Sequence, residues 1–143
     1  MNKIMISTPN IIPKGWGCEI IFASNELYCG KILRFNAGGM TSMHFHASKV
    51  ETWYVASGRF LVRMIDPRTA ERRESQFLPG SCLYLHRNAM HQLVALDAGD
   101  IFEVSTKDDA NDSYRVEGGS SQQMKQQYPP LFPQRTTNMD TSM

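Results

Sequence analysis

The chain has 143 residues, of which 41% are hydrophobic and 20% are charged, a composition that suits one globular domain with a single core. Its formal charge of +1 gives no electrostatic reason to expect nucleic acid or an anionic membrane as a partner. The three cysteines form no Cys-x-x-Cys pair and cannot all be disulfide-bonded within one chain, which favours a reducing, cytoplasmic setting.

Residues 1–13 contain only broken apolar runs, so we expect neither a signal peptide nor a membrane span there. Beyond them, short apolar segments are separated by turn residues, and none has a long helical period. The predicted strands are residues 19–23, 27–36, 50–57, 59–66, 81–85, 93–96 and 101–106. We expect the runs on either side of Ser57-Gly58 to pair as a hairpin, and residues 67–74 to form a second hairpin tip. Many short strands with turns roughly every eight to twelve residues favour an all-β sandwich or barrel.

The composition changes at about Gly118, where the chain becomes rich in Gln, Ser, Thr and Pro. Low hydrophobicity without periodicity predicts an extended or disordered tail instead of a second domain. We therefore divide the chain into a barrel domain, residues 1–118, and a low-complexity tail, residues 119–143. Within the tail, Tyr128, Leu131 and Phe132 are the apolar side chains expected to anchor it to the barrel or to a partner subunit.

Histidines are confined to one part of the chain, and all four lie between His44 and His91. Alternate residues of a strand share a face, so His44 and His46 are expected to point to the same side of a sheet. With the carboxylate of Glu51 they outline a metal site, for which the third imidazole is His91 or His86. The alternative is a surface histidine pair beside a solvated glutamate, and the small number of histidines favours the metal site.

The spacing from Gly38 to Gly58 resembles the first cupin motif without a gap. Five residues separate Gly38 from His44, one separates His44 from His46, four separate His46 from Glu51, and six lead to Gly58. The resemblance implies a small jelly-roll barrel, a double-stranded β-helix.

A second segment resembles the second cupin motif in part. Gly80 and His91 stand in the expected places, whereas His86 replaces the usual proline, Asn88 a glycine and Ala95 an asparagine. Asparagine tolerates the left-handed backbone conformation better than most residues, so Asn88 is a mild departure.

The four implied ligands, His44, His46, Glu51 and His91, form a mixed nitrogen and oxygen set. Such a set suits one divalent transition metal ion, Zn, Mn, Fe, Ni or Co, and suits Ca²⁺ poorly. An open coordination position is able to polarise the carbonyl and hydroxyl of a bound sugar.

A narrower resemblance covers roughly residues 13–118. The segments PKGWGCE (residues 13–19), KVETWYV (49–55), FEVS (102–105) and DSYR (112–115) look like the cupin domain of type II phosphomannose isomerases, also called mannose-6-phosphate isomerases. This likeness implies a sugar or sugar-phosphate substrate and a homodimer. A fold hosts many chemistries, so the activity is an expectation.

An aldose–ketose isomerase needs a base and cationic groups for the phosphate. The candidates for proton transfer are Lys49, Glu103 and His86. Lys49 is also a candidate cation for the phosphate, and His86, at the mouth of the barrel, is also a candidate to hydrogen-bond a substrate hydroxyl. Arg115 is the candidate phosphate clamp, because a guanidinium meets phosphate in a bidentate fork. Tyr84 is either an aromatic wall for a sugar or a side chain packed in the core. The alternative for Lys49 and Arg115 is surface charge, and for Glu103 it is pairing with a buried arginine.

Three functions fit these residues. The first is a metal-dependent isomerase or epimerase acting on a sugar or sugar phosphate. The second is a non-catalytic cupin that binds a small sugar-like ligand, and the third is an Fe(II) dioxygenase.

Overall fold

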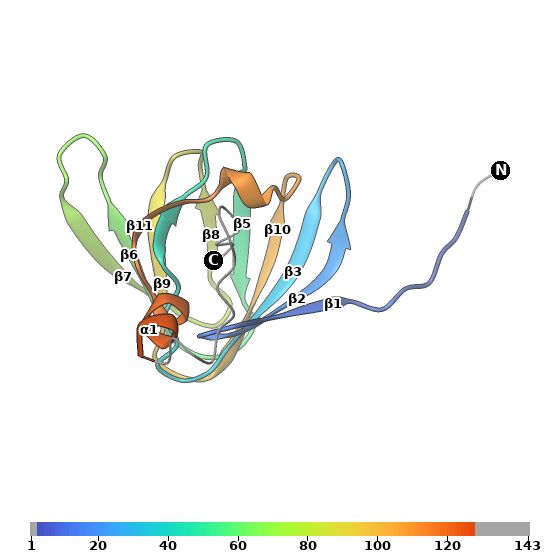
Figure 1. Ribbon diagram of the computed structural model, residues 1–143, viewed down its shortest axis with the longest axis horizontal. Coiled ribbons are helices and arrows are strands. Elements are labelled where there is room, and N and C mark those ends of the chain that lie inside the picture. Colours follow the sequence, from blue (N-terminus) through green and yellow to red (C-terminus); the bar gives the residue numbers. More distant parts are fainter. Residues whose placement is uncertain (1–2, 128–143) are drawn as a thin grey trace.

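The protein is an all-β barrel built from two antiparallel sheets that face one another (Figure 1). The computed structural model describes residues 3–127, so the predicted anchors Tyr128, Leu131 and Phe132 lie outside the described residues. Within them, the first sheet has the order β1 (Asn10–Lys14), β2 (Gly17–Ser24), β3 (Cys29–Phe35), β10 (Gly99–Ser105), β5 (Glu51–Val55) and β8 (Cys82–Leu85). The second has the order β11 (Tyr114–Glu117), β4 (Met43–Phe45), β9 (Met90–Ala95), β6 (Phe60–Ile65) and β7 (Arg72–Phe77). The predicted jelly-roll class is confirmed.

The predicted hairpin across Ser57-Gly58 is wrong, although the chain does turn there. Strand β5 pairs with β10 and β8, whereas β6 pairs with β9 and β7. Gly58 has a φ of +82°, a conformation that glycine adopts without steric cost. This turn carries the chain from one sheet to the other, so that β5 and β6 lie on opposite sides of the core. The second expected hairpin, between β6 and β7, is confirmed by their continuous pairing from Phe60↔Phe77 to Ile65↔Arg72.

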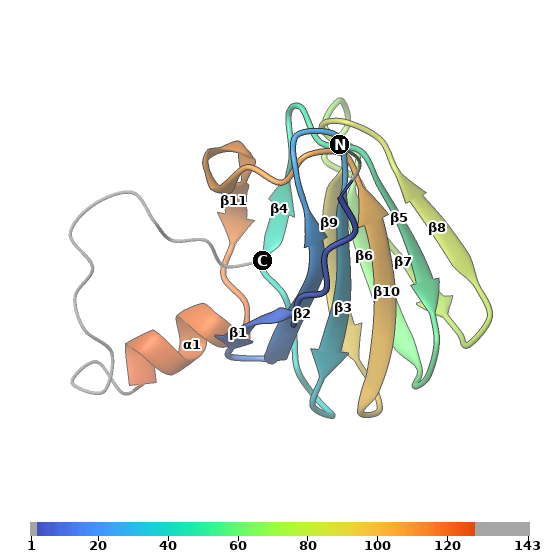
Figure 2. The same ribbon diagram turned by 90° about the vertical axis from the view of Figure 1, so that its right-hand side faces the viewer.

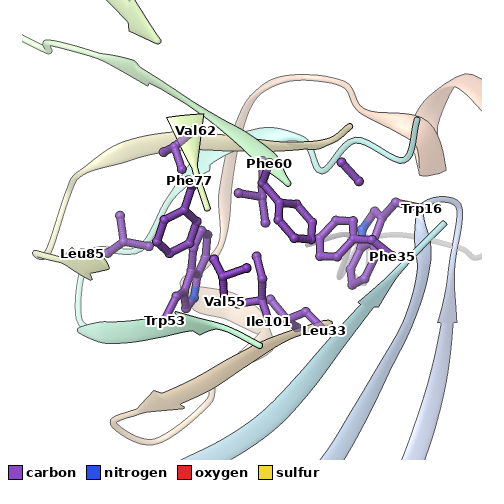
Figure 3. Close-up of a cluster of buried hydrophobic side chains, with 12 residues drawn as sticks. Trp16, Leu33, Phe35, Trp53, Val55, Phe60, Val62, Phe77, Leu85 and Ile101 are labelled. Atoms are coloured by element: carbon purple, nitrogen blue, oxygen red, sulfur yellow. The ribbon is translucent and has the colours of Figure 1, made fainter. Parts of the chain in front are cut away.

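The hydrophobic core is a cluster of buried side chains between the two sheets (Figure 3). Trp16 stacks on Phe35 at 4.3 Å between ring centroids, and Phe35 meets Phe60 edge to face at 5.3 Å. Each large side chain buried in this way contributes roughly 1.5–3 kcal/mol through removal of its apolar surface from water. The cluster holds the two sheets together at this end.

Inward-facing residues become polar toward the other end of the same strands. Along β10 the buried Ile101 is followed by the buried Glu103, and along β9 the buried Leu93 is preceded by the buried His91. On β5 the same change leads to Glu51. Because alternate residues of a strand share a face, all these side chains point into one interior, which has an apolar half and a polar half.

The segment after β11 begins with a helix, α1 (Ser120–Gln127), where the sequence predicted an extended tail. Gln, Met and Lys are good helix formers, and the Gln122 side chain accepts a hydrogen bond from the Gly119 N–H at 2.7 Å. The Ser120 and Ser121 hydroxyls accept hydrogen bonds from the backbone N–H groups of Met40 and Gly15. Contacts with distant segments therefore tie the start of α1 to the barrel. None of the helices in the described part of the chain is long and apolar enough to cross a membrane.

Candidate metal centre

Three histidines from two adjacent strands and one loop meet in the polar half of the interior. His44 on β4 pairs directly with His91 on β9, and His46 follows β4. The ring centroid of His44 lies 4.5 Å from the ring centroid of His91 and 5.1 Å from that of His46. One ring nitrogen from each histidine lies within 4.8 Å of the others. The expected convergence of His44 and His46 is therefore present, and His91, not His86, supplies the third imidazole.

The backbone fixes the orientation of all three rings. The Nδ1 atoms of His44, His46 and His91 lie 2.9, 2.8 and 2.8 Å from the carbonyl oxygens of Ser42, Asp112 and Ala89. Since a carbonyl only accepts hydrogen bonds, each Nδ1 carries the proton and each Nε2 keeps its lone pair. The three Nε2 atoms are buried and have no hydrogen-bond partner. This is the arrangement that metal-binding histidines require.

Glu51, on the opposite sheet, lies beside the histidine cluster. Its Oε1 lies 3.8 Å from His46 Nε2, and its Oε2 lies 3.8 Å from His91 Nε2. Both oxygens are buried and accept no hydrogen bond, although Oε1 is also 3.1 Å from Lys49 Nζ, an ion-pair distance. The ligand atoms that all lie within 4.8 Å of one another belong to the three histidines, so Glu51 as a fourth ligand stays a prediction. Unpartnered buried polar atoms are costly, and a transition metal ion would satisfy the three imidazole nitrogens.

The histidines are neutral at physiological pH, which is the form that binds metal. Burial is the main cause, because it disfavours the charged imidazolium. It lowers the pKa of His91 to about 4 and holds the pKa of His44 well below its usual range, with the neighbouring histidines lowering it further. The pKa of His46 is lowered by burial and by the charge of Lys49.

Lys49 lies beside the cluster, in contact with three carboxylates. Its Nζ is 3.1 Å from Glu51, 3.1 Å from Glu103 and 2.9 Å from Asp108. Burial is the largest single influence and lowers the pKa of Lys49, but the three carboxylates together raise it well above its usual range. For Glu103, burial is again the largest influence, and together with the charge of Glu51 it raises the pKa. Glu103 thus faces the interior and pairs with a lysine, not with an arginine.

A second buried lysine extends this ionic network away from the histidines. Lys31 Nζ lies 3.4 Å from Glu19 and 3.0 Å from Asp108, and Lys14 approaches Glu19 at 3.9 Å. In the described network four carboxylates face three ammonium groups. The unbalanced negative charge lies next to unpartnered imidazoles, which favours a bound cation.

The other predicted site residues lie at different places. Tyr84 is 52% exposed and pairs with Thr52 on the outer face of the first sheet, because Glu51 and Trp53 on either side of Thr52 point inward. His86 is exposed, and its ring lies 4.4 Å from that of Tyr84. The structure does not bring either residue to the histidine cluster, and their roles stay predictions.

Arg115 is exposed and pairs with His44 on the neighbouring strand β4. Directly opposed residues of an antiparallel pair have their side chains on the same face. The register therefore aligns Arg115 with the row that contains His44 and His91.

Sequence reasoning missed Lys31, Asp108 and Asp112. For Lys31 a signal was present, since it alternates with the inward-facing Leu33 and Phe35 of a predicted strand. Asp108 and Asp112 lie in a polar loop that is indistinguishable in sequence from a solvated turn. Only the folded chain brings them to residues more than fifty positions away.

A two-sheet jelly roll with three buried histidines whose ring nitrogens could hold a metal ion defines a β-barrel protein with a candidate metal centre. Residues 29–142 match the cupin family, which covers well over half of the chain. The protein belongs to the cupin family.

Several solved structures share the fold at low sequence identity. Oxalate decarboxylase from Bacillus subtilis superposes with a TM-score of 0.65 and 17% identity, over 76% of this chain and 30% of that one. The capsular polysaccharide assembling protein CapF from Staphylococcus aureus gives a TM-score of 0.67 and 18% identity, over 78% and 33%. This chain thus corresponds to about a third of each, and the likeness shows the fold alone. No curated protein matches the chain in sequence.

Proposed function

We propose that the protein is a metal-dependent isomerase or epimerase that acts on a small sugar or sugar phosphate, as the resemblance to mannose-6-phosphate isomerase implies. The observation that carries the proposal is the contact between a buried Lys49–Glu103 ion pair and a ready set of metal ligands. A protein that only binds a sugar has no need of a buried carboxylate and ammonium beside a metal. Such pairs are costly to bury and cluster at catalytic sites.

The ligands of the ion would be His44, His46, His91 and Glu51. A bound divalent transition ion, Zn, Mn, Fe, Ni or Co, would act as a Lewis acid on the carbonyl and hydroxyl oxygens of the sugar. Four protein ligands leave one or two positions open for these oxygens on a five- or six-coordinate ion.

Glu103 is the group best suited to move the proton between adjacent carbons. It is fully buried, and its carboxylate is oriented by hydrogen bonds from Trp53 Nε1 at 3.3 Å and Ser105 Oγ at 3.1 Å. It would take the proton from one carbon and return it to the next, which leaves no net change in protonation. Lys49, which stays protonated, would stabilise the negative charge that develops on the substrate.

Arg115 is the proposed recognition group for a phosphate. The register that aligns it with His44 supports this role, because one strand spacing of about 5 Å is within reach of an arginine side chain. A guanidinium binds phosphate through two parallel hydrogen bonds. Tyr84 and His86 are proposed contacts only for a part of the ligand that extends beyond the barrel.

The test is solvent hydrogen exchange into candidate substrates. Purified protein with its metal identified by mass spectrometry is incubated in D2O with hexose and pentose phosphates, and deuterium at the carbon next to the carbonyl is followed by NMR. We expect isomerisation with exchange, lost by a factor of about 10² or more in Glu103→Gln, as for removal of a general base. The variant should retain its metal. Glu74→Gln, which alters an exposed carboxylate paired with Arg63, is the matched control and should retain full activity.

Three results would contradict the proposal. Exchange at the wild-type rate in Glu103→Gln would remove its proposed role. Sugar binding without any exchange in the fully metallated protein would identify a non-catalytic cupin. Bound iron with consumption of O2 would identify a dioxygenase.

A further inference from the structure

The loop between β4 and β5, residues 46–50, begins with His46, carries Lys49 and leads to Glu51, and the proposed metal ligands therefore stand at its two ends. Three consecutive backbone N–H groups of this loop point at one carboxylate, that of Asp112. Ala47 N donates to Oδ1 at 2.9 Å, Ser48 N to both oxygens at 3.1 Å, and Lys49 N to Oδ2 at 3.0 Å. Successive N–H groups arranged in this way form an anion-binding concavity, and Asp112 fills it.

The same residue also holds a metal ligand directly. The backbone carbonyl of Asp112 accepts the hydrogen bond from Nδ1 of His46 at 2.8 Å. Asp112 is buried at the end of the short helix η1 (Ala110–Asp112), which leads into β11, the strand beside β4 (Figure 2). Side chain and main chain of one residue therefore hold both ends of the segment from His46 to Lys49.

A carboxylate is required here for a simple reason. It offers only acceptors, whereas an asparagine of the same shape presents one acceptor and one NH2 donor. In Asp112→Asn, the NH2 group of the asparagine would face backbone N–H groups of the loop, so that donor would meet donor. Other residues hold the carbonyl groups of the same loop. Asn88 N donates to His46 O at 2.7 Å, and Arg87 Nε donates to Ser48 O at 2.9 Å. The loop would thus keep some of its contacts but lose its fixed position.

We infer that Asp112 is a positioning residue that sets the orientation of His46 and the place of Lys49 through the loop between them. This inference rests on the metal centre proposed above. It predicts that metal affinity depends on a residue that is not itself a ligand, as is found for groups that orient metal-binding histidines.

The primary experiment titrates Co²⁺ into the protein, with its absorption spectrum reporting ligand geometry. Asp112→Asn should bind Co²⁺ at least roughly tenfold more weakly and with an altered spectrum, within the range expected for loss of a ligand-orienting contact. The matched control is Asp109→Asn, which removes an exposed carboxylate that caps the same helix at Asn111 N, 2.9 Å away. It should bind Co²⁺ as the wild type does. Circular dichroism and thermal unfolding verify that each variant is folded at the temperature of the titration.

Two further measurements need no metal. In the wild type, NMR should show His46 protonated at Nδ1, and the amides of Ala47, Ser48 and Lys49 should exchange slowly although they lie in a loop. Asp112→Asn, where it folds, should lose both properties.

The outcomes separate the two proposals. In one outcome, the wild type shows the Nδ1 tautomer and the slow amides but binds no transition metal ion. In that case the proposed metal centre fails, while the contacts of Asp112 with the loop remain and have no metal ligand to position. Equal Co²⁺ affinity and spectra for Asp112→Asn and the wild type would overturn the inference. Equal losses in both variants, or fast exchange of the three wild-type amides, would do the same.

Discussion

Asp108 links the two buried lysines, and its replacement by asparagine should destabilise the protein in a pH-dependent way. Its carboxylate lies 2.9 Å from Lys49 and 3.0 Å from Lys31, with 31% of the side chain exposed. Burial is the largest single influence and would raise the pKa, but the two lysines together lower the pKa of Asp108 from 3.8 to about 2. The folded protein therefore prefers the ionised carboxylate.

The magnitude follows from the linkage between protonation and folding. One pKa unit corresponds to about 1.4 kcal/mol, so the ionised Asp108 contributes about 2 kcal/mol at pH 7. A depressed pKa stabilises the fold above the unfolded value, near 4, and the contribution is lost as the pH falls toward 2. At pH 3 about 1 kcal/mol should remain.

The assay is urea unfolding of the wild type and Asp108→Asn at pH 7 and pH 3. The difference in unfolding free energy should be about 2 kcal/mol at neutral pH and should roughly halve at pH 3. Glu26→Gln is the control, because Glu26 pairs with Lys107 in solvent and should change stability little. A difference for Asp108→Asn that is independent of pH, or that is no larger than for Glu26→Gln, would refute the reasoning.

Three further predictions concern the metal, the mouth of the barrel and the assembly. A chelator should lower the melting temperature, and metal at a hundredfold excess over its Kd should restore about 2.7 kcal/mol of unfolding free energy. Full metal content in a double variant of His44→Ala and His46→Ala would contradict the assignment of these histidines as metal ligands. The His86→Gln variant should keep its metal, because His86 lies outside the histidine cluster. A turnover lower by at least roughly tenfold, about 1.4 kcal/mol, would support a role of His86 in the reaction, whereas an unchanged turnover would exclude that role. We expect a homodimer whose interface covers the exposed Phe102 and Val104 on the outer face of the first sheet. Light scattering should give twice the chain mass for the wild type and a lower mass for Phe102→Asp. A wild-type monomer at micromolar concentration would refute this prediction.

What the sequence alone determined is local in origin. Strand alternation placed His44 and His46 on one face, because the two-residue period of a strand needs no knowledge of its neighbours. The turn at Gly58 was identifiable for the same reason, since it depends on the backbone freedom of one glycine. The resemblance to the cupin motifs selected His91 over His86 as the third imidazole, and the fold class followed from the number of short strands.

The tertiary structure decided everything that depends on which strands pair. The turn at Gly58 was consistent with a hairpin, yet β5 pairs with β10, and this pairing brings Glu103 to Lys49. Asp108 and Asp112 reach the site only because the loop after β10 folds back over the loop that follows β4. Such contacts follow from sheet register, and a shift of one residue would turn every inward side chain outward. Register is set by the packing of the whole barrel, so no single segment of the sequence contains it.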